Sequence, residues 1–221
     1  MRLFLIIPLF FFLIGCNSDS AEKETSTQIE SKQPENVSEK GKIIFFGNSI
    51  TAAYKLDPKD GFSNLIQQKI DSLGLPYECI NAGNSGETSA GGLNRLDWVL
   101  KNGCDVFVLE LGANDGLRGL PLENTEKNLN EILNKVKTKY PECKLVLAGM
   151  KVPPSMGGDY ALKYDEMFTR LGSREDVAFI PFILEGVAGI PELNLEDGIH
   201  PTAEGHKILT KNVWKTLKGQ L

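Results

Sequence analysis

Short apolar runs that alternate with amphipathic segments constrain the fold of this chain more than any other feature. The segments between the runs carry apolar residues at helical spacing, as Phe62, Ile66 and Ile70 do. Alternating strands and helices predict an α/β fold, in which a parallel sheet is covered by helices on both faces. The five runs typical of buried strands cover residues 43–46, 77–81, 106–111, 145–148 and 177–181.

Two further segments between the runs can be interpreted in more detail. Residues 124–136 carry apolar side chains on one helical face, and Asn124 is of the type that caps helices, so we expect a helix to begin there. Residues 182–196 are mixed in character and predict no regular element. No internal repeat is visible, so the 221 residues predict one folded domain.

Charge and composition exclude some classes of function. The formal net charge of −5 disfavours a nucleic-acid partner, because binding to phosphates requires a basic face. The chain has only two histidines and no cluster of cysteine and histidine at metal-ligand spacing. We therefore expect no metal and no other cofactor.

The first residues have the pattern of an export signal rather than of a folded element. Arg2 precedes an apolar stretch at residues 3–14, which is too short to span a bilayer. It ends at Gly15 and Cys16, and this junction resembles the signal of bacterial lipoproteins, in which the cysteine becomes lipidated. Ordinary secretory cleavage, or a cysteine placed there by chance, is the alternative.

The sequence therefore predicts a signal peptide at residues 1–15 and a lipid-anchored Cys16. Residues 16–41 are polar, with almost nothing to bury, and predict a flexible tether. The folded domain is expected at residues 42–221, held at a membrane of the bacterial cell envelope by Cys16, on its periplasmic side or at the cell surface.

Three more cysteines follow in the domain: Cys79, Cys104 and Cys143. Three is an odd number, so at least one thiol is free or pairs outside the chain. We expect free buried thiols. Cys104 and Cys143 both precede predicted strands, so a disulfide between them is the alternative.

Small and amide residues follow three of the predicted strands, at residues 47–49, 83–86 and 112–114. Each segment alone is also typical of an ordinary strand-exit turn. The carboxyl ends of parallel strands meet at one edge of a sheet, which is where ligands bind in such folds. There Ser49 could act as a nucleophile, while glycine N–H groups and the Asn114 amide could stabilise an oxyanion.

A base for this serine is available near the end of the chain. Asp197 and His200 lie three residues apart, just before the last predicted helix. A turn there would place the carboxylate against one ring nitrogen of His200 and leave the other nitrogen for Ser49. His206 lies among polar neighbours inside that helix and is expected at the surface.

Four blocks of this sequence resemble the conserved blocks of the SGNH (GDSL) hydrolases, in the same order. The resemblance covers about residues 42–218, and residues 109–119 are similar to the branch with periplasmic acyl-CoA thioesterase/lysophospholipase and bacterial arylesterases. It implies a flavodoxin-like three-layer α/β/α sandwich with a five-stranded parallel sheet. The blocks are Gly47-Asn48-Ser49-Ile50-Thr51, Gly83-Asn84-Ser85-Gly86-Glu87-Thr88, Gly112-Ala113-Asn114-Asp115 and Asp197-Gly198-Ile199-His200-Pro201.

The resemblance also assigns roles to residues. Ser49 would be the nucleophile, with Asp197 and His200 as the other members of a triad. The Ser49 N–H, Gly86 and Asn114 would form the oxyanion hole. The family usually has aspartate where this chain has Asn48, and we expect Asn48 to keep the acceptor role without the charge.

The predicted function is a metal-independent serine esterase or thioesterase that acts on a small-molecule acyl ester, of the arylesterase, lysophospholipase or acyl-CoA thioesterase type. A carbohydrate O-deacetylase on the same fold is one alternative, since fold does not fix substrate. A non-catalytic ligand-binding lipoprotein is another. We expect a monomer.

Overall fold

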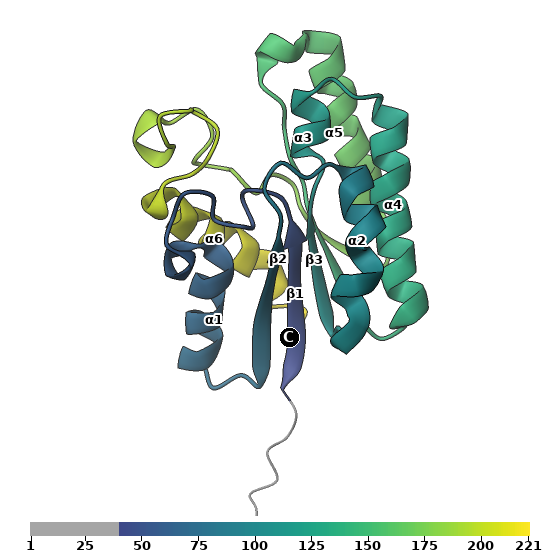
Figure 1. The fold of residues 1–221 in the computed structure, drawn as a ribbon, viewed down its shortest axis with the longest axis vertical. Helices are drawn as coiled ribbons and strands as arrows, with labels where there is room; N and C mark the ends of the chain where they lie inside the picture. The colour runs from purple at the N-terminus through teal and green to yellow at the C-terminus, as the bar shows by residue number, and fades with distance from the viewer. Residues whose placement is uncertain (1–39) are drawn as a thin grey trace, which may run out of the picture. The chain divides into compact units, whose positions relative to one another are not determined.

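A five-stranded parallel sheet lies at the centre of the structure (Figure 1). The computed structural model describes residues 40–221, so the predicted signal peptide, Cys16 and all but the last residues of the tether lie outside the described residues. The strands run in the order β2-β1-β3-β4-β5. Their bounds are β1 Gly41–Gly47, β2 Tyr77–Gly83, β3 Val106–Glu110, β4 Lys144–Ala148 and β5 Val177–Ile180.

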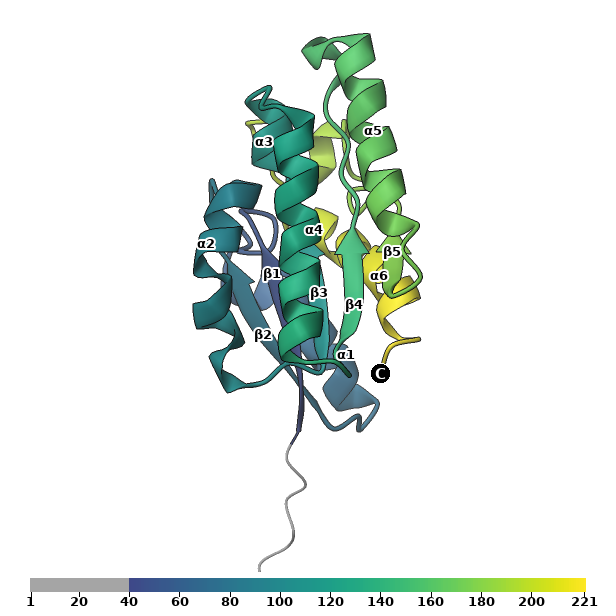
Figure 2. The ribbon, with the colours of Figure 1, turned by 90° about the vertical axis from the view of Figure 1, so that its right-hand side faces the viewer.

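Helices cover both faces of this sheet (Figures 1 and 2). One layer contains α1 and α6, which contact each other, and the opposite layer contains α2, α4 and α5, with α4 between the other two. This arrangement confirms the predicted three-layer α/β/α sandwich. None of the helices within residues 40–221 is long and apolar enough to cross a membrane. The bounds are α1 Phe62–Ser72, α2 Ser89–Val99, α3 Ala113–Leu117, α4 Leu122–Lys139, α5 Gly158–Gly172 and α6 Ala203–Leu217.

The central strands are buried on both faces, as their continuous apolar sequences predict. Residues 43–46 of β1 are at most 1% exposed, and all five residues of β3 are buried. The Phe45 ring meets the Phe62 ring of α1 edge to face at 5.4 Å, while Phe46 packs against Phe107. These contacts fix β1, and therefore the turn that follows it, in the middle of the molecule.

The start of α4 differs from the prediction. The helix begins at Leu122 with Pro121 at the capping position, and no side chain caps it. Asn124 lies inside the first turn, where its N–H donates to the Pro121 carbonyl at 3.1 Å. Pro121 has an extended ψ of 124°, which places it outside the helix, and its carbonyl accepts the N–H groups of Asn124 and Thr125, so the first turn begins directly after it.

The three cysteines within residues 40–221 are free thiols, as expected. Cys104 and Cys143 are buried at the amino ends of β3 and β4, with their sulfur atoms 3.2 Å apart. The two residues are therefore neighbours, but the alternative of a disulfide between them is not formed. Cys79, in the edge strand β2, is half-buried.

The prediction that His206 lies at the surface is wrong. His206 is 1% exposed, stacks on the Phe62 ring and accepts the Phe62 N–H with Nδ1 at 3.1 Å. Its polar sequence neighbours Glu204 and Lys207 lie on the outer side of α6, because residues one or two positions apart do not share a helix face. Burial lowers the pKa of His206 from 6.5 to about 4.

The buried imidazole predicts acid-sensitive stability. The unfolded chain binds this proton below about pH 6.5, whereas the native state takes it up only near pH 4. The contribution of neutral His206 to the free energy of unfolding is therefore fully present above pH 6.5 and is lost as the pH falls toward 4. Between pH 7 and pH 5, we expect the free energy of unfolding of the wild type to fall by about 2 kcal/mol more than that of His206→Asn. Urea unfolding at both pH values measures this difference, and parallel losses in the two proteins would contradict it.

Candidate active site

Ser49 lies in the tight turn that follows β1, at the carboxyl edge of the sheet. The turn is closed by backbone bonds from the Ala52 N–H to the Asn48 carbonyl at 2.9 Å and from the Tyr54 N–H to the Ser49 carbonyl at 3.0 Å. Ser49 is only 9% exposed. The apolar strand is the rigid support of this turn, so the serine is held in a fixed position.

His200 reaches Ser49 from a loop 151 residues further along the chain. Its Nε2 lies 2.9 Å from Ser49 Oγ, and its Nδ1 lies 2.9 Å from Asp197 Oδ2. The imidazole ring also packs against the ring of Tyr54, with centroids 4.6 Å apart. The structure thus brings together the three side chains that the sequence predicted would meet.

The Asp197 carboxylate is set up to orient this imidazole. Its other oxygen, Oδ1, accepts the backbone N–H groups of His200 and Ile199, each at 3.0 Å. These backbone bonds, from His200 and then Ile199, together with the His200 ring, hold the pKa of Asp197 well below its ordinary value. An ionised carboxylate accepts the proton of Nδ1, which leaves the lone pair of Nε2 directed at the Ser49 hydroxyl.

Two other loops bring hydrogen-bond donors to the same edge. Gly86 has a φ of +80°, and Gly112, which precedes α3, has a φ of +105°, so glycine is needed at both positions. Asn114 follows in the first turn of α3, where its Nδ2 donates to the Glu87 carbonyl at 3.0 Å. The backbone N–H groups of Ser49 and Gly86 donate to no acceptor among the described residues. One amide proton of Asn114 and these two N–H groups are therefore available to a ligand.

Comparison with known proteins agrees with this geometry. Residues 45–208 match the model of the GDSL-like Lipase/Acylhydrolase family, which covers well over half of the chain. The chain belongs to this GDSL family. The predicted family is thereby confirmed, and with it the prediction of a carboxylic ester hydrolase.

Relatives with assigned names share most of the domain. The esterase TesA of Pseudomonas aeruginosa is 37% identical over 80% of this chain and 87% of its own length. Thioesterase 1/protease 1/lysophospholipase L1 of Escherichia coli is 32% identical over 80% of this chain and 83% of its own length. Among solved structures, the psychrotrophic esterase EstA from Pseudoalteromonas is 30% identical with a TM-score of 0.74, covering 81% of this chain and 97% of that one.

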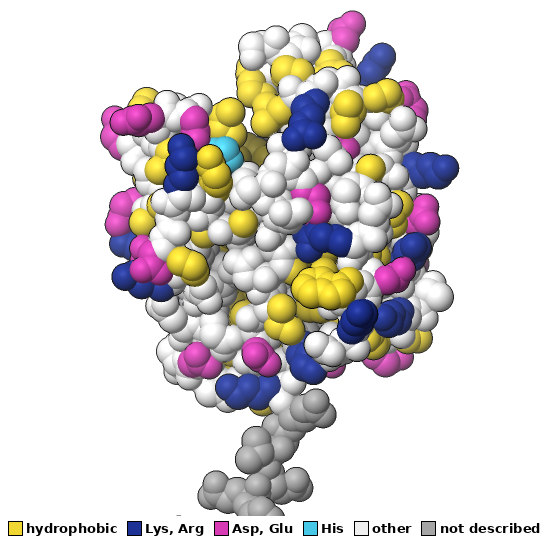
Figure 3. Space-filling view, in the orientation of Figure 1, with side chains coloured by type: hydrophobic (Ala, Val, Ile, Leu, Met, Phe, Trp, Pro, Cys, Tyr) yellow, Lys and Arg dark blue, Asp and Glu magenta, His cyan; other side chains and the backbone are white. Residues whose placement is uncertain are grey.

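An apolar cavity of about 400 Å³ lies beside the serine of this GDSL-family protein. Its lining includes the direct neighbours of three site residues, namely Ile50, Ala113 and Ile199. Figure 3 shows histidine surface on this face, next to hydrophobic side chains and a hollow. The remaining walls come mainly from the loops after β4 and β5. Their polar members are Lys151 and Asn194, and the apolar ones include Leu117, Met150, Val152, Pro153, Pro154, Phe182 and Leu184.

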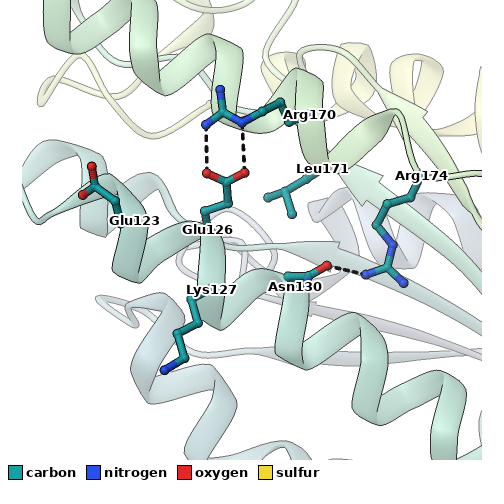
Figure 4. A pocket seen from close by; sticks show the side chains of 7 residues that line it. All are labelled: Glu123, Glu126, Lys127, Asn130, Arg170, Leu171 and Arg174. Atoms are coloured by element: carbon teal, nitrogen blue, oxygen red, sulfur yellow. Dashed lines mark hydrogen bonds and ion pairs between the residues drawn. The ribbon is translucent and has the colours of Figure 1, made fainter.

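A second cavity of about 420 Å³ has a different character and contains none of the predicted site residues. It lies between α4 and α5 (Figure 4), where Arg170 pairs with Glu126 at 2.8 Å and Arg174 donates to Asn130. These charged side chains satisfy one another at an open surface. Within residues 40–221 no group of three or more histidine, cysteine or acidic side chains is placed to hold a metal ion.

Buried charges that the sequence analysis did not single out support the loops of the site. Glu87 pairs with Arg95, whose Nη2 also donates to the Ala82 carbonyl at 2.8 Å and stabilises the exit of β2. Glu110, at the end of β3, is 1% exposed and contacts the turn that carries Ser49. An acidic residue at the end of an apolar strand was the signal in the sequence, since such residues are rarely buried without a specific partner.

Proposed function

We propose that this protein hydrolyses acyl esters through a covalent acyl-enzyme on Ser49. The observation that carries the proposal is the unbroken chain of contacts, each of 2.9 Å, from Ser49 Oγ through the His200 ring to Asp197. His200 Nε2 takes the proton of Ser49 as the hydroxyl oxygen attacks the ester carbonyl. Asp197 stabilises the imidazolium that results, and His200 then passes its proton to the departing alkoxide or thiolate.

The second half of the reaction uses the same groups. His200 removes a proton from water, the hydroxide attacks the acyl-enzyme, and Ser49 leaves with the proton returned to it. In both halves a tetrahedral oxyanion forms. The N–H groups of Ser49 and Gly86 and the free amide proton of Asn114 are the donors we assign to it. They are held before the substrate arrives, so they need not reorganise when the charge develops.

We further propose that the acyl part of the substrate is a hydrocarbon chain or an aryl group. The cavity beside Ser49 is apolar, and apolar cavities of this size bind ligands mainly by burying hydrophobic surface. Relatives named esterase and thioesterase/lysophospholipase agree with such substrates. Lys151 and Asn194 are the polar side chains of this lining, so most hydroxyl groups of a sugar would face apolar walls, which disfavours carbohydrate deacetylation.

The place of action that we propose rests on the sequence of the first residues. Residues 1–15 form the signal peptide, Cys16 carries the lipid, and residues 16–41 tether the domain of residues 42–221 to the cell envelope. The enzyme acts there as a monomer. A lipid anchor would keep the hydrolase close to acyl esters that partition into membranes.

Replacing the nucleophile should remove activity and leave the fold intact. We expect Ser49→Ala to lower kcat by about 10⁴-fold or more on p-nitrophenyl esters, with an unchanged melting temperature. Ser85, in the neighbouring loop, is exposed and serves as the matched control, so Ser85→Ala should retain activity. A series from acetyl to palmitoyl esters, with acetylated sugars alongside, measures the substrate class. Normal turnover by Ser49→Ala would contradict the proposal, and a preference for acetylated sugars would overturn the substrate class.

The Asn114 amide should stabilise the transition state more than the bound substrate. We expect Asn114→Ala to lower kcat by about 10²–10³-fold with a much smaller change in KM. Asn114→Asp should be at least as harmful, because it places a negative charge near the oxyanion. Steady-state kinetics and the melting temperature are measured on the same preparation. A stable and fully active Asn114→Asp enzyme would show that Asn114 only holds the Glu87 loop.

The proposed lipid anchor predicts that loss of Cys16 moves the enzyme out of the membrane fraction of the cell. Cys16→Ser should abolish labelling with radioactive palmitate and release the enzyme from membranes, because serine lacks the thiol that carries the lipid. The several acyl chains of a bacterial lipoprotein anchor it firmly, whereas a single chain binds membranes only marginally. Cys79→Ser, which changes a cysteine of the folded domain, should remain in the membrane fraction. Equal membrane fractions for the wild type and Cys16→Ser would refute the anchor.

A further inference from the structure

The Glu110 carboxylate is the most heavily hydrogen-bonded group beneath the nucleophile turn. Its Oε1 accepts Asn48 Nδ2 at 2.7 Å. Its Oε2 accepts the Asn48 N–H at 3.2 Å, the Thr51 N–H at 3.2 Å and the Thr51 hydroxyl at 2.8 Å. The two partner residues lie on either side of Ser49. One buried anion thus holds both flanks of the turn.

The orientation of the Asn48 amide is set by a backbone group. Its Oδ1 accepts the Ile50 N–H at 3.0 Å, and an N–H can only donate. Nδ2 must therefore face Glu110. Asn48 Oδ1 also lies 3.4 Å from Ser49 Oγ, so the same amide touches the nucleophile and the carboxylate. The predicted acceptor role of Asn48 is seen in these contacts, and its donor role toward Glu110 is an addition.

The contacts fit an ionised carboxylate. Three of the four groups that bond to the Glu110 oxygens within the described residues can only donate, namely Asn48 Nδ2 and the N–H groups of Asn48 and Thr51, and the Thr51 hydroxyl is able to donate as well. Burial raises the pKa of Glu110 to about 7, against the opposing effect of the bonds from Thr51 and Asn48. The anion therefore depends on its donors, and the turn depends on the anion.

Gly47 and the Glu110 carboxylate are closely packed against each other. A Cβ atom at Gly47 would lie 2.6 Å from Glu110 Oε2 and 2.8 Å from the Glu110 carbonyl oxygen, so only glycine lets β1 and the carboxylate approach so closely. A shift of the carboxylate must then move the turn itself. Displacements of about 1 Å in a reacting group cost on the order of 10²-fold in rate.

We propose that Glu110 is a positioning residue for the Ser49 nucleophile and acts through the side-chain amide of Asn48. This inference rests on the proposed function, because it concerns the same serine. Glu110 touches neither the substrate nor the reacting atoms. Its effect on the reaction is to fix the direction of Ser49 Oγ toward His200 Nε2.

The test exchanges the two polar groups between the two positions. In Glu110→Gln the amide nitrogen faces the Asn48 amide nitrogen, donor against donor. In Asn48→Asp, which restores the usual aspartate of the family, two carboxyl groups face each other and one can take up a proton and donate it to the other. In the double variant Asn48→Asp/Glu110→Gln, the new amide donates to the new carboxylate, whose other oxygen still accepts the Ile50 N–H. The double variant keeps the net charge of the wild type.

We expect Glu110→Gln to lower kcat by about 10²-fold with a KM changed much less, Asn48→Asp to retain most of the activity, and the double variant to recover most of the loss. The rate of labelling of Ser49 by a fluorophosphonate should follow kcat, because it reports the nucleophile without an ester substrate. Glu123→Gln, an exposed exchange of the same kind, should leave both rates unchanged. Melting temperatures identify any loss that comes from unfolding.

Several outcomes would overturn the proposal. A Glu110→Gln variant with normal kcat would show that Glu110 only stabilises the fold, and so would a lower melting temperature with a normal labelling rate. A double variant that folds and is as slow as Glu110→Gln would show that Asn48 does not transmit the effect. If the wild-type serine is not labelled at all, the proposed function fails instead, so the two failures are distinguishable.

Discussion

The parallel register of three strands is the constraint on which the site depends. Gly47, the last residue of β1, is paired with Gly83 of β2 on one side and with Glu110 of β3 on the other. The strands therefore end at the same level, and their exit loops begin within hydrogen-bonding distance of one another. A shift of one residue in either pairing would turn every side chain of a strand to the opposite face and separate the loops. The core of phenylalanine and aliphatic residues that fixes this register is thus the foundation of the chemistry.

The carboxylates of Asp197 and Glu110 lie in different environments, one partly exposed and the other buried. Asp197 is partly exposed, with 33% of its side chain accessible, and two backbone N–H groups keep it ionised. Glu110 is 1% exposed and needs four donors to offset the cost of burial. The first orients the imidazole, and we infer that the second orients the serine. In both cases backbone N–H groups supply part of the stabilisation, which makes the geometry depend on the loops rather than on flexible side chains.

Much of the fold followed from local patterns in the sequence. The apolar runs and the helical spacing between them predicted the parallel α/β/α sandwich, because strands buried on both faces must be apolar throughout. The positions of Ser49, Gly86 and Asn114 after three strands predicted their convergence, since parallel strands end at one edge. The short spacing of Asp197 and His200 likewise predicted their contact. These are consequences of chain direction and periodicity, which a sequence carries in full.

Contacts between distant segments were decided only by the tertiary structure. The burial of His206 depends on how α6 packs on Phe62, which lies 144 positions earlier in the chain. The role we infer for Glu110 depends on β3 lying beside β1, which brings residues 62 positions apart within 2.7 Å. The sequence by itself determined the elements, their order and the residues at the carboxyl edge. Which polar side chains face one another across that edge was decided by tertiary packing, because hydrogen bonds between distant segments form only where the close-packed core fixes both partners.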